Sequence, residues 1–359
     1  MSFKIGIVGL PNVGKSTLFN ALTKQQAQAS NFPFTTIDPN VGVINVPDER
    51  LAKLSAQEKS AKIVPTSIEF IDIAGLVKGA AEGAGLGNKF LSHIREVDAI
   101  VQVVRFFKND EIIHVDGSVN PARDIEVINL ELMFADLSTV NKRLESLARE
   151  IKGGDKEALL LKAALEKIKT SLDDGKPART VALNEEESRL VKGLSLLSMK
   201  PVLYVGNTSG NNPPQSPLIL RGDETAKEPL LIDVKIEQEL SELTDDERVE
   251  YMKELGISES GLDRLAKAAY KLLNLITFFT AGPIETKAWT IVSGTKAPQA
   301  AGVIHTDFEK GFIRAEIIGW DKLLEAGSYA NARDKGWLRV EGKEYIMQDG
   351  DVAHFRFNV

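Results

Sequence analysis

The chain has 359 residues, of which 43 % are apolar and 26 % are charged, which is the composition of a soluble globular protein. This length is more than one ordinary hydrophobic core holds, and it favours two or three domains. The formal net charge of −7 excludes a protein that coats nucleic acid over its whole surface, so an RNA contact would need a local basic patch and no DNA partner is expected.

The absence of cysteine and of long apolar runs constrains the expected cellular compartment. The chain has no cysteine, which excludes disulfides and cysteine-based zinc sites and fits a reducing compartment. No apolar run approaches the roughly 18 residues that a membrane-spanning helix needs, and no secretory leader precedes the first predicted strand. We therefore expect a cytoplasmic, monomeric protein without a membrane partner.

Residues 9–16 read Gly-Leu-Pro-Asn-Val-Gly-Lys-Ser and match the phosphate-loop pattern G-x-x-x-x-G-K-[ST]. A predicted strand at 3–8 precedes them and an amphipathic helix begins at 17, which is the context that the motif requires. The glycines let backbone N–H groups point at phosphate oxygens, and the helix N-terminus adds partial positive charge. The alternative is a structural glycine turn. Lys15 should reach the β- and γ-phosphates and the Ser16 hydroxyl should ligate Mg²⁺. The predicted nucleotide-binding residues here are Asn12, Val13, Gly14, Lys15, Ser16 and Thr17.

Segment 31–39, Asn-Phe-Pro-Phe-Thr-Thr-Ile-Asp-Pro, lies where a nucleotide switch would carry a threonine. Such a threonine ligates Mg²⁺ while the γ-phosphate is present. We prefer Thr36 to Thr35 for this role, and a hydroxyl that caps the loop is the alternative.

Residues 72–75, Asp-Ile-Ala-Gly, form a D-x-x-G element directly after the predicted strand 66–71. Asp72 should hold Mg²⁺ through a water molecule, and the Gly75 N–H should meet the γ-phosphate. The next residue is Leu76, where many GTPases have the glutamine that orients the attacking water.

Leu76 cannot form a hydrogen bond through its side chain, so another residue must position the water or hydrolysis must be slow and gated. His114 is the candidate, in a polar loop after the predicted strand 99–105, because an imidazole can orient or deprotonate water near neutral pH. A surface histidine without a catalytic role is the alternative.

From about residue 124, apolar residues recur three to five positions apart among charged ones, which predicts a long amphipathic helix. Gly153 and Gly154 interrupt the pattern before it resumes. We interpret residues 124–198 as a helical coiled-coil hairpin, the alternative being further surface helices of the same domain. The hairpin would be inserted into a nucleotide-binding domain that comprises residues 1–123 and 199–275.

Base selectivity depends on the segment after the predicted strand 201–206. Guanine is normally bound by an N-K-x-D motif, but this position holds Asn207-Thr208-Ser209-Gly210, without a carboxylate. The site is therefore open to adenine, whose amino group can donate to backbone carbonyls. Thr208 could offer such backbone contacts, and Asn207 would brace the loop.

From residue 276 onward, β-branched and aromatic residues alternate with polar ones, as in residues 287–292 and 311–317. This alternation is typical of strands with one buried face, and it predicts a separate, small β-rich domain over residues 276–359.

Together, these motifs resemble the YchF/Obg-like ATPase family, in the Obg-related branch of translation-factor NTPases. The resemblance covers nearly the whole chain. It rests on residues 6–17 (GIVGLPNVGKST), 31–37 (NFPFTTI), 72–80 (DIAGLVKGA), 85–91 (GLGNKFL) and 305–316 (HTDFEKGFIRAE).

The resemblance implies an α/β P-loop NTPase fold of Ras-like type, with an inserted coiled coil and a C-terminal ubiquitin-like β-grasp (TGS) domain. It also implies Mg²⁺-dependent hydrolysis of ATP in preference to GTP, a nucleotide-gated switch, and association with the ribosome or its RNA. Lys15, Gly75 and His114 are the implied catalytic residues. A K⁺ ion held with the help of Asn12 is implied by potassium-stimulated relatives.

Two features depart from the family pattern, and both concern the base. The family usually shows N-x-x-E after the late strand, where this chain ends the element with Gly210, and it usually has small residues where this chain has Val234 and Lys235. The alternatives are therefore an Obg-type GTPase, or a ribosome or RNA adaptor in which hydrolysis only resets the state.

Overall fold

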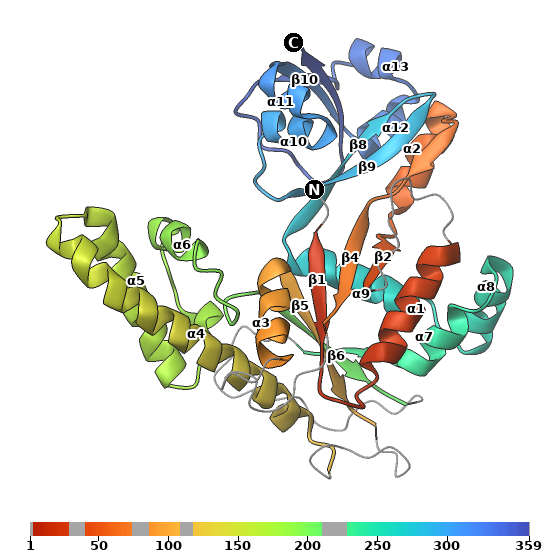
Figure 1. The fold of residues 1–359 in the computed structure, drawn as a ribbon. Coiled ribbons are helices and arrows are strands. Elements are labelled where there is room, and N and C mark those ends of the chain that lie inside the picture. The colour runs from red at the N-terminus through yellow and green to blue at the C-terminus, as the bar shows by residue number, and fades with distance from the viewer. Residues whose placement is uncertain (1–2, 29–39, 74–85, 108–117, 210–227, 359) are drawn as a thin grey trace. The chain divides into compact units, whose positions relative to one another are not determined.

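The computed structural model describes residues 3–28, 40–73, 86–107, 118–209 and 228–358. The chain divides into two compact units (Figure 1). The first comprises residues 3–43 and 69–262, and the second comprises residues 1–2, 44–68 and 263–359. Among the helices in the described ranges, none is long and apolar enough to cross a membrane.

The first unit is built on a six-stranded sheet with the strand order β2-β4-β1-β5-β6-β7. Strand β1 pairs in parallel with β4 and β5, and β6 pairs in parallel with β5 and β7. All seven residues of β5 are buried, as expected for a parallel strand that is covered on both faces. The strands are β1 (Lys4–Val8), β2 (Val41–Asn45), β4 (Ser67–Asp72), β5 (Ala99–Arg105), β6 (Val202–Asn207) and β7 (Leu230–Ile232).

Helices lie between these strands and after the last of them. Helix α1 follows the loop after β1, and its Leu18 and Leu22 are fully buried. The helices are α1 (Lys15–Gln28), α3 (Leu86–Glu96), α7 (Val234–Leu240) and α8 (Asp245–Glu254). Helix α9 (Gly261–Leu272) begins two residues before the second unit and otherwise belongs to that unit.

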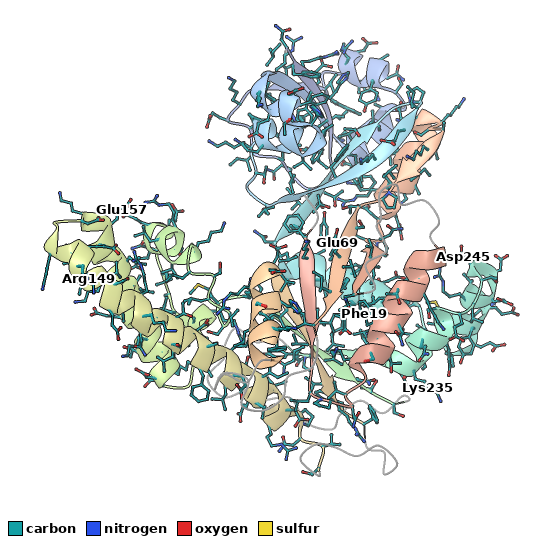
Figure 2. The ribbon with its side chains drawn as sticks, in the orientation of Figure 1. Phe19, Glu69, Arg149, Glu157, Lys235 and Asp245 are labelled. Carbon is teal, nitrogen blue, oxygen red and sulfur yellow. The ribbon has the colours of Figure 1, made fainter. Side chains whose placement is uncertain are left out.

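A long helix, α4 (Pro121–Lys152), and helix α5 (Lys156–Asp173) occupy the segment between β5 and β6. Asn120 caps the start of α4 by accepting a hydrogen bond from the Arg123 N–H at 3.2 Å. Figure 2 shows Arg149 and Glu157 at the end of the hairpin, where α4 passes into α5. The two helices share a buried core that includes Val140, Leu147, Ala164, Leu165 and Ile168. A short 3-10 helix (Ala178–Thr180) and α6 (Glu185–Lys192) complete the segment.

Asp136 on α4 fixes the chain where it returns toward β6. Its buried carboxylate accepts hydrogen bonds from the Leu197 N–H at 2.8 Å, the Ser198 N–H at 2.7 Å and the Ser198 hydroxyl at 2.6 Å. Burial raises the pKa of Asp136, and these hydrogen bonds act in the opposite direction. A buried carboxylate is tolerated here because its oxygens have donors.

The second unit contains a six-stranded sheet with the order β11-β10-β12-β8-β9-β3. Strand β10 pairs antiparallel with β11 and β12, β8 pairs antiparallel with β9, and the pairings β8–β12 and β3–β9 are parallel. The strands are β3 (Lys62–Val64), β8 (Leu275–Ala281), β9 (Glu285–Val292), β10 (Phe312–Gly319), β11 (Arg339–Glu341) and β12 (Asp351–Phe357). The helices are α2 (Glu49–Glu58), α10 (Ala297–Ile304), α11 (Thr306–Lys310), α12 (Trp320–Ala326) and α13 (Tyr329–Asp334).

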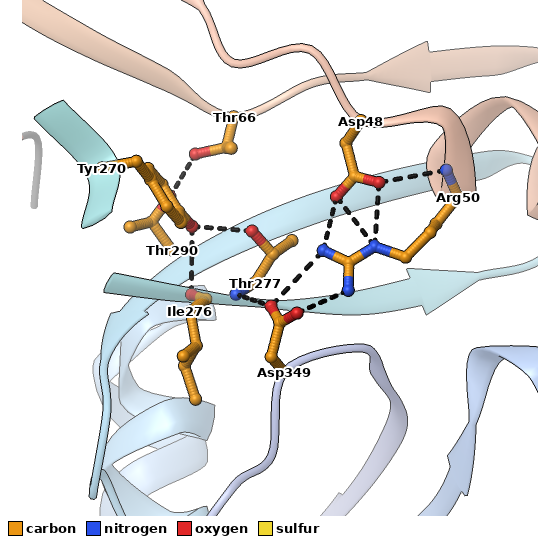
Figure 3. A network of polar contacts seen from close by, with 8 residues as sticks. All are labelled: Asp48, Arg50, Thr66, Tyr270, Ile276, Thr277, Thr290 and Asp349. Carbon is orange, nitrogen blue, oxygen red and sulfur yellow. Dashed lines mark hydrogen bonds and ion pairs between the residues drawn. The ribbon is translucent and has the colours of Figure 1, made fainter. Parts of the chain in front are cut away.

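A polar network ties segment 44–68 to the C-terminal part of this unit (Figure 3). Arg50 lies between two carboxylates, with contacts of 2.8 Å to Asp48 and 2.7 Å to Asp349. Asp349 also accepts a hydrogen bond from the Thr277 N–H at 2.9 Å. This division differs from the predicted boundaries, which place residues 44–68 in the nucleotide-binding domain, because a ten-residue helix and a three-residue strand carry no signal of which sheet they join.

Candidate nucleotide-binding site

The predicted site residues that the structure describes lie at the carboxyl ends of three strands of the parallel sheet. The phosphate loop follows β1, Asp72 ends β4, and Asn207 ends β6. Ligands of open α/β sheets bind at this edge.

Steric constraints fix the path of the phosphate loop. A Cβ atom on Gly9 would lie 2.8 Å from the Val103 carbonyl oxygen, so only glycine allows this approach to β5. Gly14 has a φ of 97° and Asn12 a φ of 63°, both in the left-handed region. Between them, Val13 is fully buried and anchors the loop.

Helix α1 begins at Lys15, immediately after the loop. The Leu18 N–H donates to the Gly14 carbonyl at 3.0 Å, so the helix continues directly from the curled backbone. The first turn contains no acidic residue of its own that would compete with an anion for the positive end of the helix dipole. Ser16 is exposed in this turn and Thr17 is half-buried.

Lys15 forms an ion pair with Asp72, which joins the first helix to the end of β4. Both side chains are partly shielded, with exposed fractions of 12 % for Lys15 and 24 % for Asp72. The backbone around Asp72 is held as well, because its N–H donates to the Asn40 carbonyl at 3.0 Å and the Ile73 N–H donates to the Ile7 carbonyl at 3.2 Å. The Lys15 ammonium, which we expect to contact the phosphates, and the Asp72 carboxylate, which we expect near the metal ion, therefore lie side by side.

These residues fit a magnesium–nucleotide complex. Mg²⁺ prefers one or two protein oxygens together with water and phosphate oxygens, and Ser16 and Asp72 supply oxygens of that kind. Within the described ranges, no group of three or more His, Cys, Asp or Glu residues could hold a metal ion.

Asn207 braces the phosphate loop from the end of β6. Its amide nitrogen donates to the Val13 carbonyl at 2.9 Å, and its amide oxygen accepts from the Val234 N–H at 3.4 Å. The side chain is 5 % exposed, and a Cβ atom on Gly14 would lie 2.2 Å from its amide nitrogen. The adjacent Thr208 is half-buried and donates its N–H to the Ile232 carbonyl at 2.9 Å.

Several predicted residues lie outside the described residues, namely Thr36, Gly75 and His114, together with Leu76 and Gly210. Their roles stay predictions.

The sequence analysis did not predict that the start of α7 lies at this edge of the parallel sheet. Asp233 caps that helix by accepting from the N–H groups of Lys235 at 3.1 Å and Ile236 at 3.2 Å. The capped helix presents the Val234 N–H to Asn207, so the loop, β6 and α7 are joined through one amide side chain. The aspartate directly after the short strand 230–232 is the sequence feature that could have indicated the start of this helix, because aspartate commonly caps helix N-termini.

Comparison with known proteins gives two family matches. Residues 4–136 match the family described as 50S ribosome-binding GTPase, and residues 275–358 match YchF-GTPase_C, described as a protein of unknown function. A Bacillus subtilis protein named "Ribosome-binding ATPase YchF" is 53 % identical over 366 residues, covering all of both chains.

This chain belongs to the YchF family. The Pasteurella multocida YchF, with the same printed name, is 51 % identical over the full length of both proteins. The solved structure titled "Structure of the Schizosaccharomyces pombe YchF GTPase" superposes with a TM-score of 0.85 at 40 % identity, covering 99 % of this chain and 98 % of that one. The predicted family and the predicted P-loop α/β fold are both confirmed.

We predict that Asn207→Ala weakens ATP binding by roughly tenfold, because it leaves the Val13 carbonyl and the Val234 N–H without their partner. Isothermal titration with Mg²⁺ would measure the change. Asn141→Ala on α4 is the matched control and should bind like the native chain. An Asn207→Ala protein with native affinity would contradict the bracing role.

Proposed function

We propose that this chain is a Mg²⁺-dependent nucleoside triphosphate hydrolase that prefers ATP to GTP and associates with the ribosome. The observation that carries the proposal is the Lys15–Asp72 pair at the N-terminus of α1, beside a braced phosphate loop. The curated relatives support the reaction and the partner, since their printed name is "Ribosome-binding ATPase YchF".

In the proposed mechanism, the loop amides and Lys15 hold the phosphates in line for attack, and little covalent chemistry is left for the protein. Ser16, Thr36 and a water on Asp72 would hold Mg²⁺, which neutralises charge on the phosphate oxygens. The Gly75 N–H would meet the γ-phosphate. Asp72 lies within reach of this arrangement because it already contacts Lys15.

Water activation is assigned to His114 in this proposal, because Leu76 has no hydrogen-bonding group in its side chain. A His114→Ala protein that retains native turnover would contradict the assignment.

Asn12, which is exposed on the phosphate loop, is the proposed K⁺ ligand, and equal turnover in K⁺ and Na⁺ would contradict that role.

Selectivity for adenine rests on the segment after β6, which lacks the carboxylate that binds guanine. Asn207 is 5 % exposed and its amide bonds to the phosphate loop and to α7, so we assign it to bracing rather than to base selection. Backbone groups near Thr208 are left for the base edge, and a backbone carbonyl accepts from the adenine amino group. The printed names of relatives differ on the nucleotide, because the Schizosaccharomyces pombe protein is titled a GTPase.

Side-by-side titration of ATP and GTP with Mg²⁺ would test this selectivity. We predict that ATP binds about tenfold more tightly, the difference expected from one base hydrogen bond that is made with adenine and left unmade with guanine. Lys15→Ala should abolish the binding of both nucleotides, which separates phosphate binding from base selection. Tighter binding of GTP would instead support the Obg-type alternative.

The proposed switch couples nucleotide state to ribosome association. We predict that co-sedimentation with purified ribosomes differs between ATP, ADP and a non-hydrolysable ATP analogue, since the γ-phosphate orders switch segments. The Lys15→Ala protein should lose this dependence on nucleotide. Equal co-sedimentation in all three states would contradict the switch and would favour an adaptor whose hydrolysis only resets it.

A further inference from the structure

Strand β12 at the end of the chain has one edge that is only partly paired. Along the other edge it pairs with β10 from Asp351 to Phe357. Toward β8 the register consists of one residue pair, Val352 with Phe279, although β12 continues for five residues beyond it.

The alternation of an antiparallel ladder shows where the backbone groups of β12 point. Just outside the two ends of the strand, the Trp320 N–H donates to the Gly350 carbonyl at 3.0 Å and the Asn358 N–H donates to the Gly311 carbonyl at 2.9 Å. The N–H of Gly350 itself donates to the Thr277 carbonyl of β8 at 2.8 Å, before the regular pairing with β10 begins at Asp351. Even-numbered residues of β12 therefore exchange hydrogen bonds with β10, and the groups of alternate residues face the opposite edge. The N–H groups of Phe355 and Phe357 thus point toward the side where β8 has ended.

A groove lies along this edge. It has a volume of about 690 Å³, and its lining includes residues 353–357 of β12 and residues 280–285 at the turn between β8 and β9. Trp289 and Phe308 give it apolar walls, and Ile284 at its rim is 84 % exposed. Its volume lies within the range of about 300–1,000 Å³ typical of ligand sites. We name this groove the β12 slot.

Charge is unevenly distributed along the β12 slot. Glu316 is 3.3 Å from Arg356 and 3.6 Å from Arg333, so one carboxylate serves two guanidinium groups and one positive charge remains uncompensated within this trio. Partial burial and the charge of Arg356 lower the pKa of the neighbouring His354, which disfavours its charged form. A ligand carboxylate would be favoured at this end.

We propose that the β12 slot binds an extended peptide of a partner protein, which adds as a strand along β12 with apolar side chains at alternate positions and a carboxylate beside Arg333 and Arg356. Exposed strand edges recruit such peptides through main-chain hydrogen bonds, and pockets for alternate side chains supply specificity. The β12 slot lies in the second unit and uses no residue of the nucleotide site. This inference therefore stands apart from the proposed hydrolysis.

The direct test uses the full chain and a defined probe, an acetylated and amidated hexapeptide of alternating threonine and valine with one glutamate. We expect saturable binding by fluorescence anisotropy, and slower amide hydrogen exchange at Phe355 and Phe357. The same peptide with N-methyl groups on its central amides keeps its side chains but loses the backbone N–H groups that would donate to β12. It should bind roughly tenfold more weakly.

Variants of the β12 slot distinguish the contribution of its backbone N–H groups from that of its charged side chains. Phe357→Pro removes the N–H that faces the β12 slot, whereas Phe357→Ala removes the same ring and keeps that N–H, so the proline variant should bind the probe several-fold more weakly than the alanine variant. Arg333→Glu should reverse the preference for the glutamate peptide over its lysine counterpart, and Lys322→Glu, outside the slot, should leave it unchanged.

Three outcomes would overturn the proposal. The first is no binding of the probe, or equal binding of its N-methylated form. The second is displacement of the bound peptide by oligouridylate, which would assign the slot to RNA. The third is a concentration-dependent dimer that the peptide dissociates, which would make a second copy of the chain the occupant. ATP hydrolysis is measured in the same samples, so failure of the peptide site and failure of the nucleotide site are told apart.

Discussion

The nucleotide site depends on the close contact between the phosphate loop and the end of β6. Gly14 has no side chain, and this absence lets the Asn207 amide reach the Val13 carbonyl at 2.9 Å. The left-handed φ of 97° at Gly14 would strain any other residue. One hydrogen bond and one missing Cβ atom therefore hold a loop whose curled backbone would otherwise have many conformations. Preorganisation of this kind matters because donors that are already aimed at phosphate need no reorganisation on binding.

The charges of the site are arranged around the same loop. Lys15 and Asp72 come from elements 57 positions apart in the chain, yet the parallel pairing of β1 with β4 brings them into contact. The partly shielded setting strengthens the attraction between them relative to a fully exposed pair. A triphosphate with Mg²⁺ offers both groups stronger partners, since the ammonium would face phosphate oxygens and the carboxylate a hydrated cation. The pair is thus suited to exchange partners when nucleotide binds.

The sequence predicted much of this architecture, because the phosphate loop and the D-x-x-G element encode backbone geometry directly. Glycine at positions 9 and 14 has a steric meaning that can be read without a structure, and strand 99–105, all of whose residues are buried, was predicted with the bounds that the structure shows. Asn207 was expected to brace the loop after strand 201–206. Its hydrogen bonds to Val13 of the phosphate loop and to Val234 were not expected, because they depend on where that loop and a capped helix lie in space.

Segment 44–68 could not be assigned from its pattern for a related reason. Its membership in the second unit follows from Arg50 between Asp48 and Asp349, a contact between residues about 300 positions apart, and local periodicity carries no information on such pairings. The groove beside β12 was likewise invisible, because it arises where β8 ends before its neighbour does. Base recognition stays a proposal, since the segment after β6 lacks the carboxylate that would have identified guanine.

The measurement that tests the central claim most directly is the affinity of the chain for ATP, ADP and AMP, each titrated with Mg²⁺ present. If the loop, Lys15 and the N-terminus of α1 provide most of the binding energy, ATP and ADP should bind at least about a hundredfold more tightly than AMP. If AMP binds as tightly as ATP, the base or sugar provides that energy instead, and the account of the phosphate loop given above is contradicted.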